Sequence, residues 1–282
     1  MSIQFSRVIP TRPSSIGNVF SARSLELANV RSSPVMVVDD FRVSGRPFGP
    51  HPHAGFSAIT YVFQDSRGSL RNRDSLGNHV VVGPGGICWL QAGSGAQHEE
   101  IPAETGKELR GLQVFVNLSA RNKLSDPKVY SLLGEQVPEW RSSAGGDRVR
   151  VAAGSFEGVS SPLVPTEPFT LLDLELHREM RFALEDAHNA IVYARNGDLV
   201  VRSSEREQRL SAGQGLAAFG GPGIITLHAT SRADVMLLSG AEIREPVVVH
   251  GPFIMNDRAQ IDAAMERYRS GRMGSLAPFS QG

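Results

Sequence analysis

Two short stretches of this sequence carry side chains that can bind a metal ion, at a spacing suited to β-strands. One is His-Pro-His at residues 51–53, and the other is His-Glu-Glu at residues 98–100. Residues i and i+2 of a strand point to the same face, whereas residue i+1 points to the opposite face. The first and last side chains of each stretch can therefore lean onto one ion, with Glu99 turned away. The predicted metal ligands are His51, His53, His98 and Glu100.

This donor set indicates the kind of metal and the kind of site. Three imidazoles and one carboxylate suit Fe, Mn, Ni, Cu or Zn better than Ca or Mg. Four protein donors in one hemisphere leave two neighbouring positions open on a six-coordinate metal, as in a reactive site rather than a closed structural one. A lone His-x-His is a weak signal, because surface histidines on unrelated loops produce the same pattern. The turn residues that precede both stretches favour the metal site.

Strand-like segments, rich in β-branched and aromatic residues, alternate with glycine- and proline-containing turns through most of the chain. In the first half the predicted strands cover residues 3–8, 35–38, 56–63, 69–73, 80–82, 87–90 and 112–117. In the second half they cover residues 149–153, 171–176, 190–193, 199–202, 216–219, 224–227 and 235–238. The alternation within the segment 112–117 can place Gln113 or Phe115 in a pocket. Many short strands at this spacing predict an all-β chain of jelly-roll barrels.

A polar connection over residues 119–146 interrupts the strand pattern. We place the domain boundary within it, with residues 1–134 as an N-terminal metal-binding domain and residues 135–282 as a C-terminal domain. A C-terminal helix is predicted to begin at Asn256 or Asp257, which can cap it, and to stop at Gly271. Its apolar face, spaced i, i+3, i+4 and i+7, is expected to pack across the outside of a barrel. That face consists of Ile261, Ala264, Met265 and Tyr268.

The second half of the chain repeats the turn glycines of the first. Alignment of residue 85 with residue 213 also aligns glycines 93 and 95 with glycines 221 and 223. The same alignment puts Thr226 at the position of His98 and His228 at that of Glu100. We therefore predict one barrel with a metal and one without, with His188 or His228 as the residues that a second site would use. The histidines expected to be structural or exposed are His177, His188, His228 and His250.

Composition narrows the function classes. The 282 residues contain 29 Lys and Arg against 29 Asp and Glu, and no basic stripe offers itself to nucleic acid. The single cysteine, Cys88, cannot form an intramolecular disulfide and is expected to be a buried small hydrophobe. The first ten residues lack the apolar core of a signal peptide, and no run approaches the length of a membrane span. These features predict a cytoplasmic protein without a direct nucleic-acid or membrane partner.

Several longer motifs resemble those of the pirin family. They are residues 51–56 (HPHAGF), 73–78 (RDSLGN), 92–100 with its two candidate ligands, 111–118 (GLQVFVNL) and 251–256 (GPFIMN). The resemblance spans nearly the whole chain and implies two cupin barrels facing each other, with metal only in the N-terminal one. It also implies iron(II) bound by His51, His53, His98 and Glu100. Mn, Ni, Cu, Co and Zn suit the same donors.

Three positions depart from the pattern of that family. Asn72 stands where histidine is frequent, and Phe115 stands where tryptophan is common. Ser57 occupies a position where many cupins carry a metal-binding glutamate, a role that Glu100 can fill here. The first two changes are expected to reshape the pocket.

Two functions are compatible with this resemblance. The first is a quercetinase-type dioxygenase, which uses O2 to open the heterocycle of a flavonol with release of CO. Glu100 would then also serve as the catalytic proton acceptor, and Phe56, Trp89 and Phe115 are candidates for an aromatic wall, although the core is the expected place of at least two of them. The second is a non-enzymatic, iron- or redox-sensing regulator that binds a protein partner. Isomerisation of a small oxygenated substrate is a weaker third reading, because one cupin fold serves many reactions.

Overall fold

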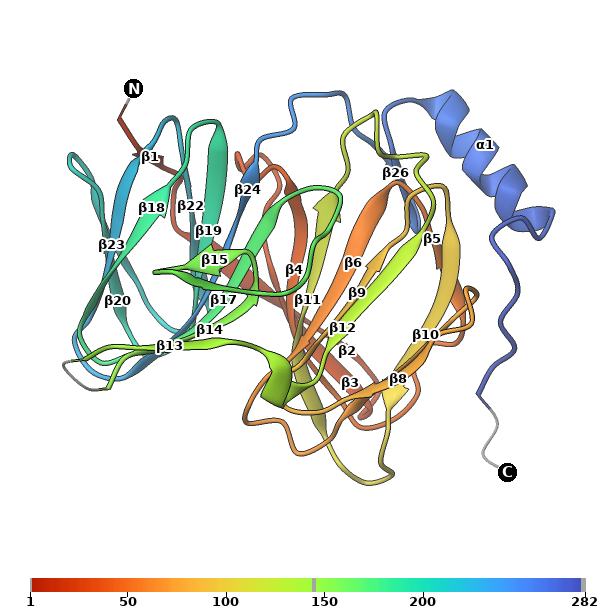
Figure 1. The fold of residues 1–282 in the computed structure, drawn as a ribbon, viewed down its shortest axis with the longest axis horizontal. Helices are drawn as coiled ribbons and strands as arrows, with labels where there is room; N and C mark the ends of the chain where they lie inside the picture. Colours follow the sequence, from red (N-terminus) through yellow and green to blue (C-terminus); the bar gives the residue numbers. More distant parts are fainter. Residues whose placement is uncertain (1, 144–145, 280–282) are drawn as a thin grey trace. The chain divides into compact units, whose positions relative to one another are not determined.

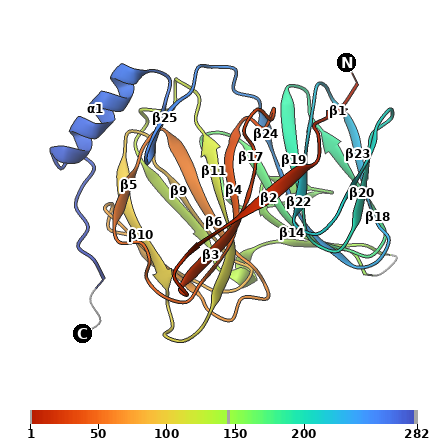
Figure 2. The same cartoon turned by 180° about the vertical axis from the view of Figure 1, so that it is seen from behind.

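The structure is a computed structural model that describes residues 2–143 and 146–279. Nearly all regular elements in these ranges are β-strands, and one α-helix lies near the C-terminus (Figures 1 and 2). This confirms the all-β class with a C-terminal helix. No helix in the described ranges is long and apolar enough to cross a membrane.

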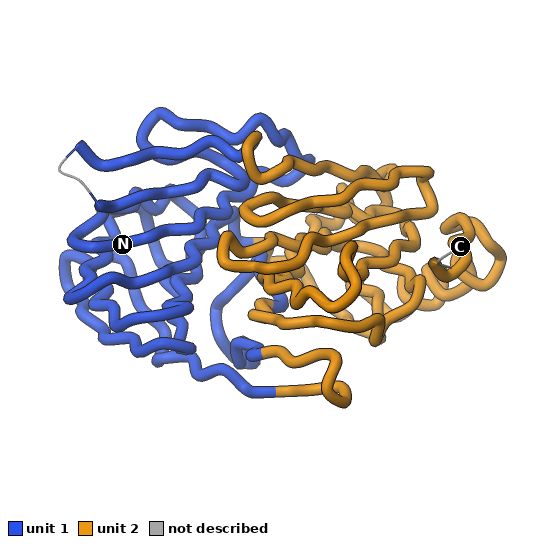
Figure 3. Tube along the Cα trace, turned by 90° about the horizontal axis from the view of Figure 1, so that it is seen from below, with its two compact units in different colours: residues 1–13, 23–37, 137–242 blue, residues 14–22, 38–136, 243–282 orange. Residues whose placement is uncertain are grey.

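The chain forms two compact units, each assembled from separate stretches of sequence (Figure 3). Unit 1 comprises residues 1–13, 23–37 and 137–242, and unit 2 comprises residues 14–22, 38–136 and 243–282. The strands β2 (Ile9–Ile16), β3 (Phe20–Leu25) and β4 (Val35–Val43) are each divided between the units. The domain boundary placed after residue 134 from the sequence lies close to residues 136 and 137, where the chain passes from unit 2 to unit 1. The structure groups residues 243–282 with unit 2, whereas the sequence boundary groups them with the C-terminal domain.

Unit 2 is built from two antiparallel sheets. The first has the order β12-β9-β6-β11-β4, and the second has the order β5-β10-β7-β8. The strands of the first sheet are β6 (Phe56–Val62), β9 (Ile87–Gln91), β11 (Leu109–Asn117), β12 (Lys128–Leu132) and the end of β4. Those of the second sheet are β5 (His51–His53), β7 (Leu70–Asp74), β8 (His79–Val82) and β10 (Ala96–Pro102). Cys88 on β9 is buried among apolar side chains, as predicted.

Unit 1 repeats this arrangement. Its first sheet has the order β22-β19-β24-β17-β14-β13, with β1 (Gln4–Phe5) also paired to β22, and its second sheet has the order β18-β23-β20-β21. The strands of the first sheet are β13 (Glu139–Arg141), β14 (Arg148–Ala153), β17 (Phe169–Leu176), β19 (His188–Asn196), β22 (Gln214–Phe219) and β24 (Ala233–Ala241). Those of the second are β18 (Glu179–Leu184), β20 (Leu199–Arg202), β21 (Glu207–Leu210) and β23 (Gly223–Ala229). A short hairpin joins β15 (Ser155–Phe156) to β16 (Val159–Ser160).

The repeat predicted from the glycines is therefore real, since β9-β6-β11-β4 matches β22-β19-β24-β17 in order. The residue alignment within it was wrong by one position. Ile225 and Leu227 of β23 enter the core of unit 1, so Thr226 between them points to the other face. Turn glycines fix the approximate place of a strand, whereas a shift of one residue exchanges its two faces.

The polar connection at residues 119–146 contains more structure than expected. β12 pairs with β9 in unit 2, the 3-10 helix η1 spans Gly134–Gln136, and β13 pairs with β14 in unit 1. Leu132, which is buried at the end of β12, was the apolar residue that indicated a strand in this connection.

The C-terminal helix α1 (Arg258–Arg269) packs in unit 2, next to the hairpin of β25 (Val248–His250) and β26 (Phe253–Met255). The Asp257 side chain accepts a hydrogen bond from the amide of Gln260 and so caps the helix, as predicted. Ile261 and Ala264 are buried against Met255, but Tyr268 is 39% exposed and is not a core residue.

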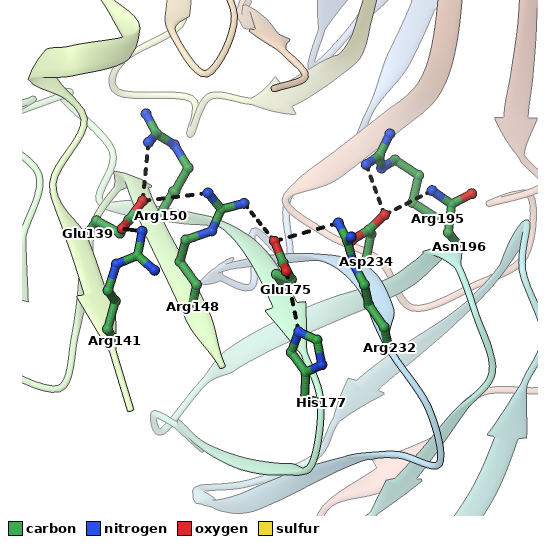
Figure 4. A network of polar contacts seen from close by, with 10 residues as sticks. All are labelled: Glu139, Arg141, Arg148, Arg150, Glu175, His177, Arg195, Asn196, Arg232 and Asp234. Carbon is green, nitrogen blue, oxygen red and sulfur yellow. Dashed lines mark hydrogen bonds and ion pairs between the residues drawn. The ribbon is translucent and has the colours of Figure 1, made fainter. Parts of the chain in front are cut away.

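Charged side chains cover the outer face of the large sheet in unit 1 (Figure 4). Glu175 on β17 contacts Arg148 at 3.0 Å and Arg232 at 3.6 Å, and Asp234 contacts Arg195 at 3.2 Å. The neighbouring residues on each strand, such as Val149 and Leu174, point into the apolar core. Strand alternation thus places the polar network of this barrel outside it.

Candidate metal centre

The three predicted histidines meet in unit 2. Antiparallel pairing of β5 with β10 places His51 opposite His98, and His53 follows two residues later on the same face. The possible ligand atoms of these three side chains all lie within 4.8 Å of one another. The Nε2 atoms of His51 and His98 are 3.2 Å apart. The i, i+2 spacing read from the sequence therefore produces a convergent group.

Hydrogen bonding and burial prepare the imidazoles for a metal. His51 Nδ1 lies 2.9 Å from the Gly49 carbonyl oxygen, which can only accept, so the proton is on Nδ1 and Nε2 carries a lone pair. Burial, assisted by the neighbouring His51, lowers the pKa of His53 to about 3. Burial, assisted by His53 and His51, also lowers the pKa of His98 well below its ordinary value. Both rings are then neutral at physiological pH, and neutral imidazole is the form that binds metals.

Glu100 lines the same pocket and has a different environment. Thr60 Oγ1 lies 3.0 and 2.8 Å from its two carboxylate oxygens and 3.0 Å from Gln113 Oε1. Gln113 Nε2 donates to the carbonyl of Ile59, which turns its Oε1 toward Thr60. Burial raises the pKa of Glu100 to about 7, although the Thr60 hydrogen bond opposes that change. A hydroxyl has one proton, so both contacts of Thr60 are satisfied together when protonated Glu100 donates to Thr60 and Thr60 donates to Gln113.

Glu99, between the two ligand candidates, points the opposite way as predicted. It forms an ion pair with Arg73 and is 4% exposed. The strand thus presents its odd and even positions to two separate environments.

A cavity of about 340 Å³ opens in front of the histidines, entirely within unit 2. Its walls are mostly aromatic and aliphatic, with a few polar groups at the metal end and along β4 and β11. The lining residues are Phe20, Asp39, Phe41, Val43, Pro47, Phe48, His51, His53, Leu70, His98, Glu100, Leu109, Gln113 and Phe115. This volume suits a small organic ligand.

The sequence predicted only part of this wall. Gln113 and Phe115 line the cavity, but Phe56 and Trp89 do not and belong to the core. Phe56 instead packs edge-on against the ring of His53, with centroids 5.0 Å apart. Asn72, one of the departures from the family pattern, is buried opposite Glu100 in the β7–β10 pairing. The sequence analysis missed the wall residues on β3 and β4. The alternation of Phe41 and Val43 in β4 could have indicated that these two side chains share one face.

The turn after His53 is held by a distant segment. Gly55 adopts a left-handed φ of +82°, and a Cβ there would come within 2.0 Å of the Ile254 carbonyl oxygen. The buried Lys123 ammonium donates to the carbonyl oxygens of Gly55 and Ile254, at 2.9 Å each, and to Asn117 Oδ1 at 2.6 Å. These bonds fix the end of β5, and with it the position of its histidines.

The residues of this site fit a metal ion. Three histidines bring possible donor nitrogens within 4.8 Å of one another, at least two of the rings are held neutral, and a cation between them can accept their lone pairs. Imidazole donors suit first-row transition metals such as Fe, Ni, Cu and Zn. No second such group of donors occurs in the described ranges. His188 and His228 belong to no such group in this part of the chain.

Comparison with protein families agrees with the two-barrel architecture. Residues 13–116 match the pirin family model, and residues 171–274 match the model of the pirin C-terminal cupin domain. A protein of Pseudomonas aeruginosa named "Putative quercetin 2,3-dioxygenase" is 34% identical over 254 residues, which cover 86% of this chain and 87% of that protein. The chain belongs to the pirin family. Human pirin is 29% identical over 254 residues, covering 88% of this chain and 85% of pirin.

Solved structures of pirin-type proteins share the fold. A quercetin 2,3-dioxygenase from Acinetobacter baumannii superimposes with a TM-score of 0.86 at 23% identity, covering 98% of this chain and all of the other. A bacterial pirin from Escherichia coli in complex with nickel(II) gives a TM-score of 0.64 at 18% identity, covering 85% of this chain and all of that one. At these identities the likeness establishes two cupin domains, and the chemistry must be argued from the site.

Proposed function

We propose that this pirin-family protein is a metal-dependent dioxygenase that opens the heterocycle of a flavonol. The observation that carries the proposal is the placement of three converging histidines and a carboxyl group at the end of a largely apolar 340 Å³ cavity. The names of the relatives point in the same direction.

The walls suggest the class of substrate. No lysine or arginine is found among the described residues that line the cavity, while Asp39 and Glu100 are. A carboxylate substrate would find no basic side chain along these walls, whereas a flat, uncharged phenolic ligand can pack against Phe41 and Phe115.

The metal ligands in this proposal are His51, His53, His98 and Glu100, and the metal is iron(II). The chemistry that the metal supplies when bound is Lewis acidity toward the adjacent hydroxyl and carbonyl oxygens of the flavonol, together with the reaction with O2 that releases CO. His53 and His98 contribute by remaining neutral, and the apolar walls contribute by excluding water from the reacting face.

Glu100 is proposed to accept the flavonol hydroxyl proton as well as to bind the metal. In the metal-free protein burial raises the pKa of Glu100 to about 7, so this carboxyl can gain or lose a proton near physiological pH. Thr60 and Gln113 hold it in the pocket through the hydrogen bonds described above. A proton that arrives on Glu100 has an acceptor in Thr60 Oγ1.

A second candidate function is a metal-responsive regulator that binds a protein partner. It is favoured by the bond between His51 Nδ1 and the Gly49 carbonyl, which connects a ligand to the loop before β5. A change of metal charge could reach the surface through that loop. This function requires no turnover and tolerates a closed pocket.

The test is oxygen uptake by anaerobically iron(II)-loaded protein after addition of quercetin, with CO measured in parallel. Uptake in step with quercetin loss, and its absence in His98→Ala, would support the dioxygenase. Protein that retains its iron but consumes no oxygen would overturn the quercetinase proposal and favour the regulator. His228→Ala, a histidine change in the other barrel, is the matched control.

A further inference from the structure

The C-terminal segment of residues 273–279 lies along the outer face of the strand that carries His98 and Glu100. The Met273 side chain is buried against Gly95, where a Cβ would come within 2.4 Å of its Cε atom. Ser75 Oγ donates to the Met273 carbonyl at 2.8 Å, and the Gln97 side-chain amide donates to the carbonyl of Gly274. The segment is thus anchored before it reaches its last described residue.

Phe279 is that last residue, and it contacts the back of the metal centre. Its amide donates to the Glu99 carboxylate at 3.1 Å, and Glu99 is the buried residue between the two ligand candidates of β10. Three guanidinium groups lie 5.0 to 5.1 Å from its ring centroid, a distance typical of cation–π contacts. They belong to Arg46, Arg71 and Arg73.

Arg46 differs from the other two arginines because it lies in a loop rather than on a strand. Arg71 and Arg73 lie on β7 and are fixed by its pairing with β10. Arg46 lies in residues 44–50, which connect β4 to β5 without regular secondary structure, and its Nη1 atom donates to the Phe279 carbonyl at 3.2 Å. We call this connection the rim loop.

The rim loop forms part of the cavity wall. Pro47 and Phe48 line the cavity, and Phe48 packs edge-on against Phe20 with ring centroids 5.2 Å apart. Phe48 is nevertheless 43% exposed, so it stands at the mouth rather than in the core. The next residue, Gly49, holds His51 through its carbonyl.

We propose that residues 273–279 act as a strap that keeps the rim loop over the mouth of the cavity, with Phe279 as the positioning residue. Phe279 holds Arg46, which lies two residues before Phe48 in the rim loop, and Phe48 narrows the entrance to the metal centre. Release of the strap would widen the entrance without removing any group that binds the metal. The strap therefore regulates the rate at which a ligand enters and the size of ligand that the entrance admits. The inference rests on the proposed metal site but not on flavonol turnover.

The test measures access to the metal directly. Nickel-loaded protein is mixed with a bulky aromatic chelator, and the rate of metal removal is compared among Phe279→Ala, Arg46→Ala, Arg71→Ala and the unchanged protein. Arg71→Ala is the matched control, because it removes a guanidinium from the same ring without touching the rim loop. Hydrogen exchange of residues 44–50 is recorded on the same proteins.

The strap predicts faster metal removal in Phe279→Ala and Arg46→Ala, by about three- to fivefold for the loss of the contact between Phe279 and Arg46, with faster exchange in the rim loop and unchanged metal stoichiometry. Arg71→Ala should show neither change. Equal rates in all four proteins would overturn the proposal, and so would an equal acceleration in all three variants with a lowered melting temperature. In protein that takes up no nickel the proposed metal site fails, and exchange of the rim loop alone then decides the question of the strap.

Discussion

The two barrels of this chain have the same strand order but fill their interiors differently. In unit 2, β10 presents His98 and Glu100 to an open cavity. In unit 1, the equivalent strand β23 presents Ile225 and Leu227 to a closed apolar core. The same contrast holds for the strands beside them, since β5 contributes two histidines and β18 contributes Met180, Phe182 and Leu184.

This difference shows that a binding site inside a barrel reduces the stability that apolar burial provides. Apolar side chains at the inward positions stabilise unit 1 by leaving water, at about 1.5–3 kcal/mol for each large residue fully buried. Unit 2 has less of this stabilisation, because its inward positions hold histidines and a glutamate. Burial of such polar side chains is unfavourable unless they form hydrogen bonds or bind an ion. Unit 2 compensates with external supports, namely the buried Lys123, the turn at Gly55 and the C-terminal segment.

The largest effect is expected from removal of one of the histidines that distinguish the interior of unit 2 from that of unit 1. His98→Ala should lower metal affinity by about 1000-fold, because changes to groups that merely orient a ligand already cost about 10- to 100-fold. Metal content after dialysis and a competitive titration measure this. The matched change His228→Ala should leave one metal per chain. Loss of metal in His228→Ala would show that the second barrel also binds, against the contrast drawn here.

A second prediction compares the interiors by removing the same volume from each. Leu227→Ala in the closed core should cost about 3 kcal/mol of the free energy of unfolding, because the cavity that remains cannot collapse. Leu109→Ala, beside the open pocket, should cost about half as much, because that space is already accessible. Urea unfolding of the metal-free proteins gives both values. Equal losses would mean that the pocket is as tightly packed as the core.

The convergence of the three histidines could be predicted because its geometry is local. An i, i+2 spacing on a strand fixes the face of His51 and His53 whatever the rest of the fold does. The wall residues Phe20 and Phe41 could not be assigned in this way, because the faces of a strand are visible in sequence but its neighbours in the barrel are not. The pairing of β4 beside β11 is a long-range property of the fold.

The glycine alignment of the repeats misplaced Thr226 by one residue, since turns tolerate insertions while the faces of a strand do not. Residues 243–282 follow the second barrel in the sequence, but the structure groups them with the first, where the Lys123 ammonium donates to the Ile254 carbonyl. Sequence separation gives no information about such a contact.

The third prediction uses the pKa of Glu100 in the metal-free protein. Burial raises this pKa to about 7 from its ordinary value of 4.5, so the folded state holds the proton more tightly than the unfolded state. Stability contributed by this group is full below pH 4.5 and is lost as the pH rises through 7. Glu100→Gln should therefore stabilise the metal-free protein by about 2 kcal/mol at pH 8 and by much less at pH 5. Denaturant titrations at the two pH values test this, and a gain that did not depend on pH would contradict the role of the buried charge.

The smallest effect on the free energy of unfolding is expected from changes to the charged residues on the outer face of unit 1. Glu175 contacts Arg148 and Arg232 on the outer face of the sheet, and its side chain is 23% exposed (Figure 4). Glu175→Gln should cost only about 0.5 kcal/mol, and less at high salt, because solvent screens such pairs. Urea unfolding at low and high ionic strength gives the two values. A loss as large as that of Leu227→Ala would mean that the outer network, rather than the apolar interior, holds this barrel together.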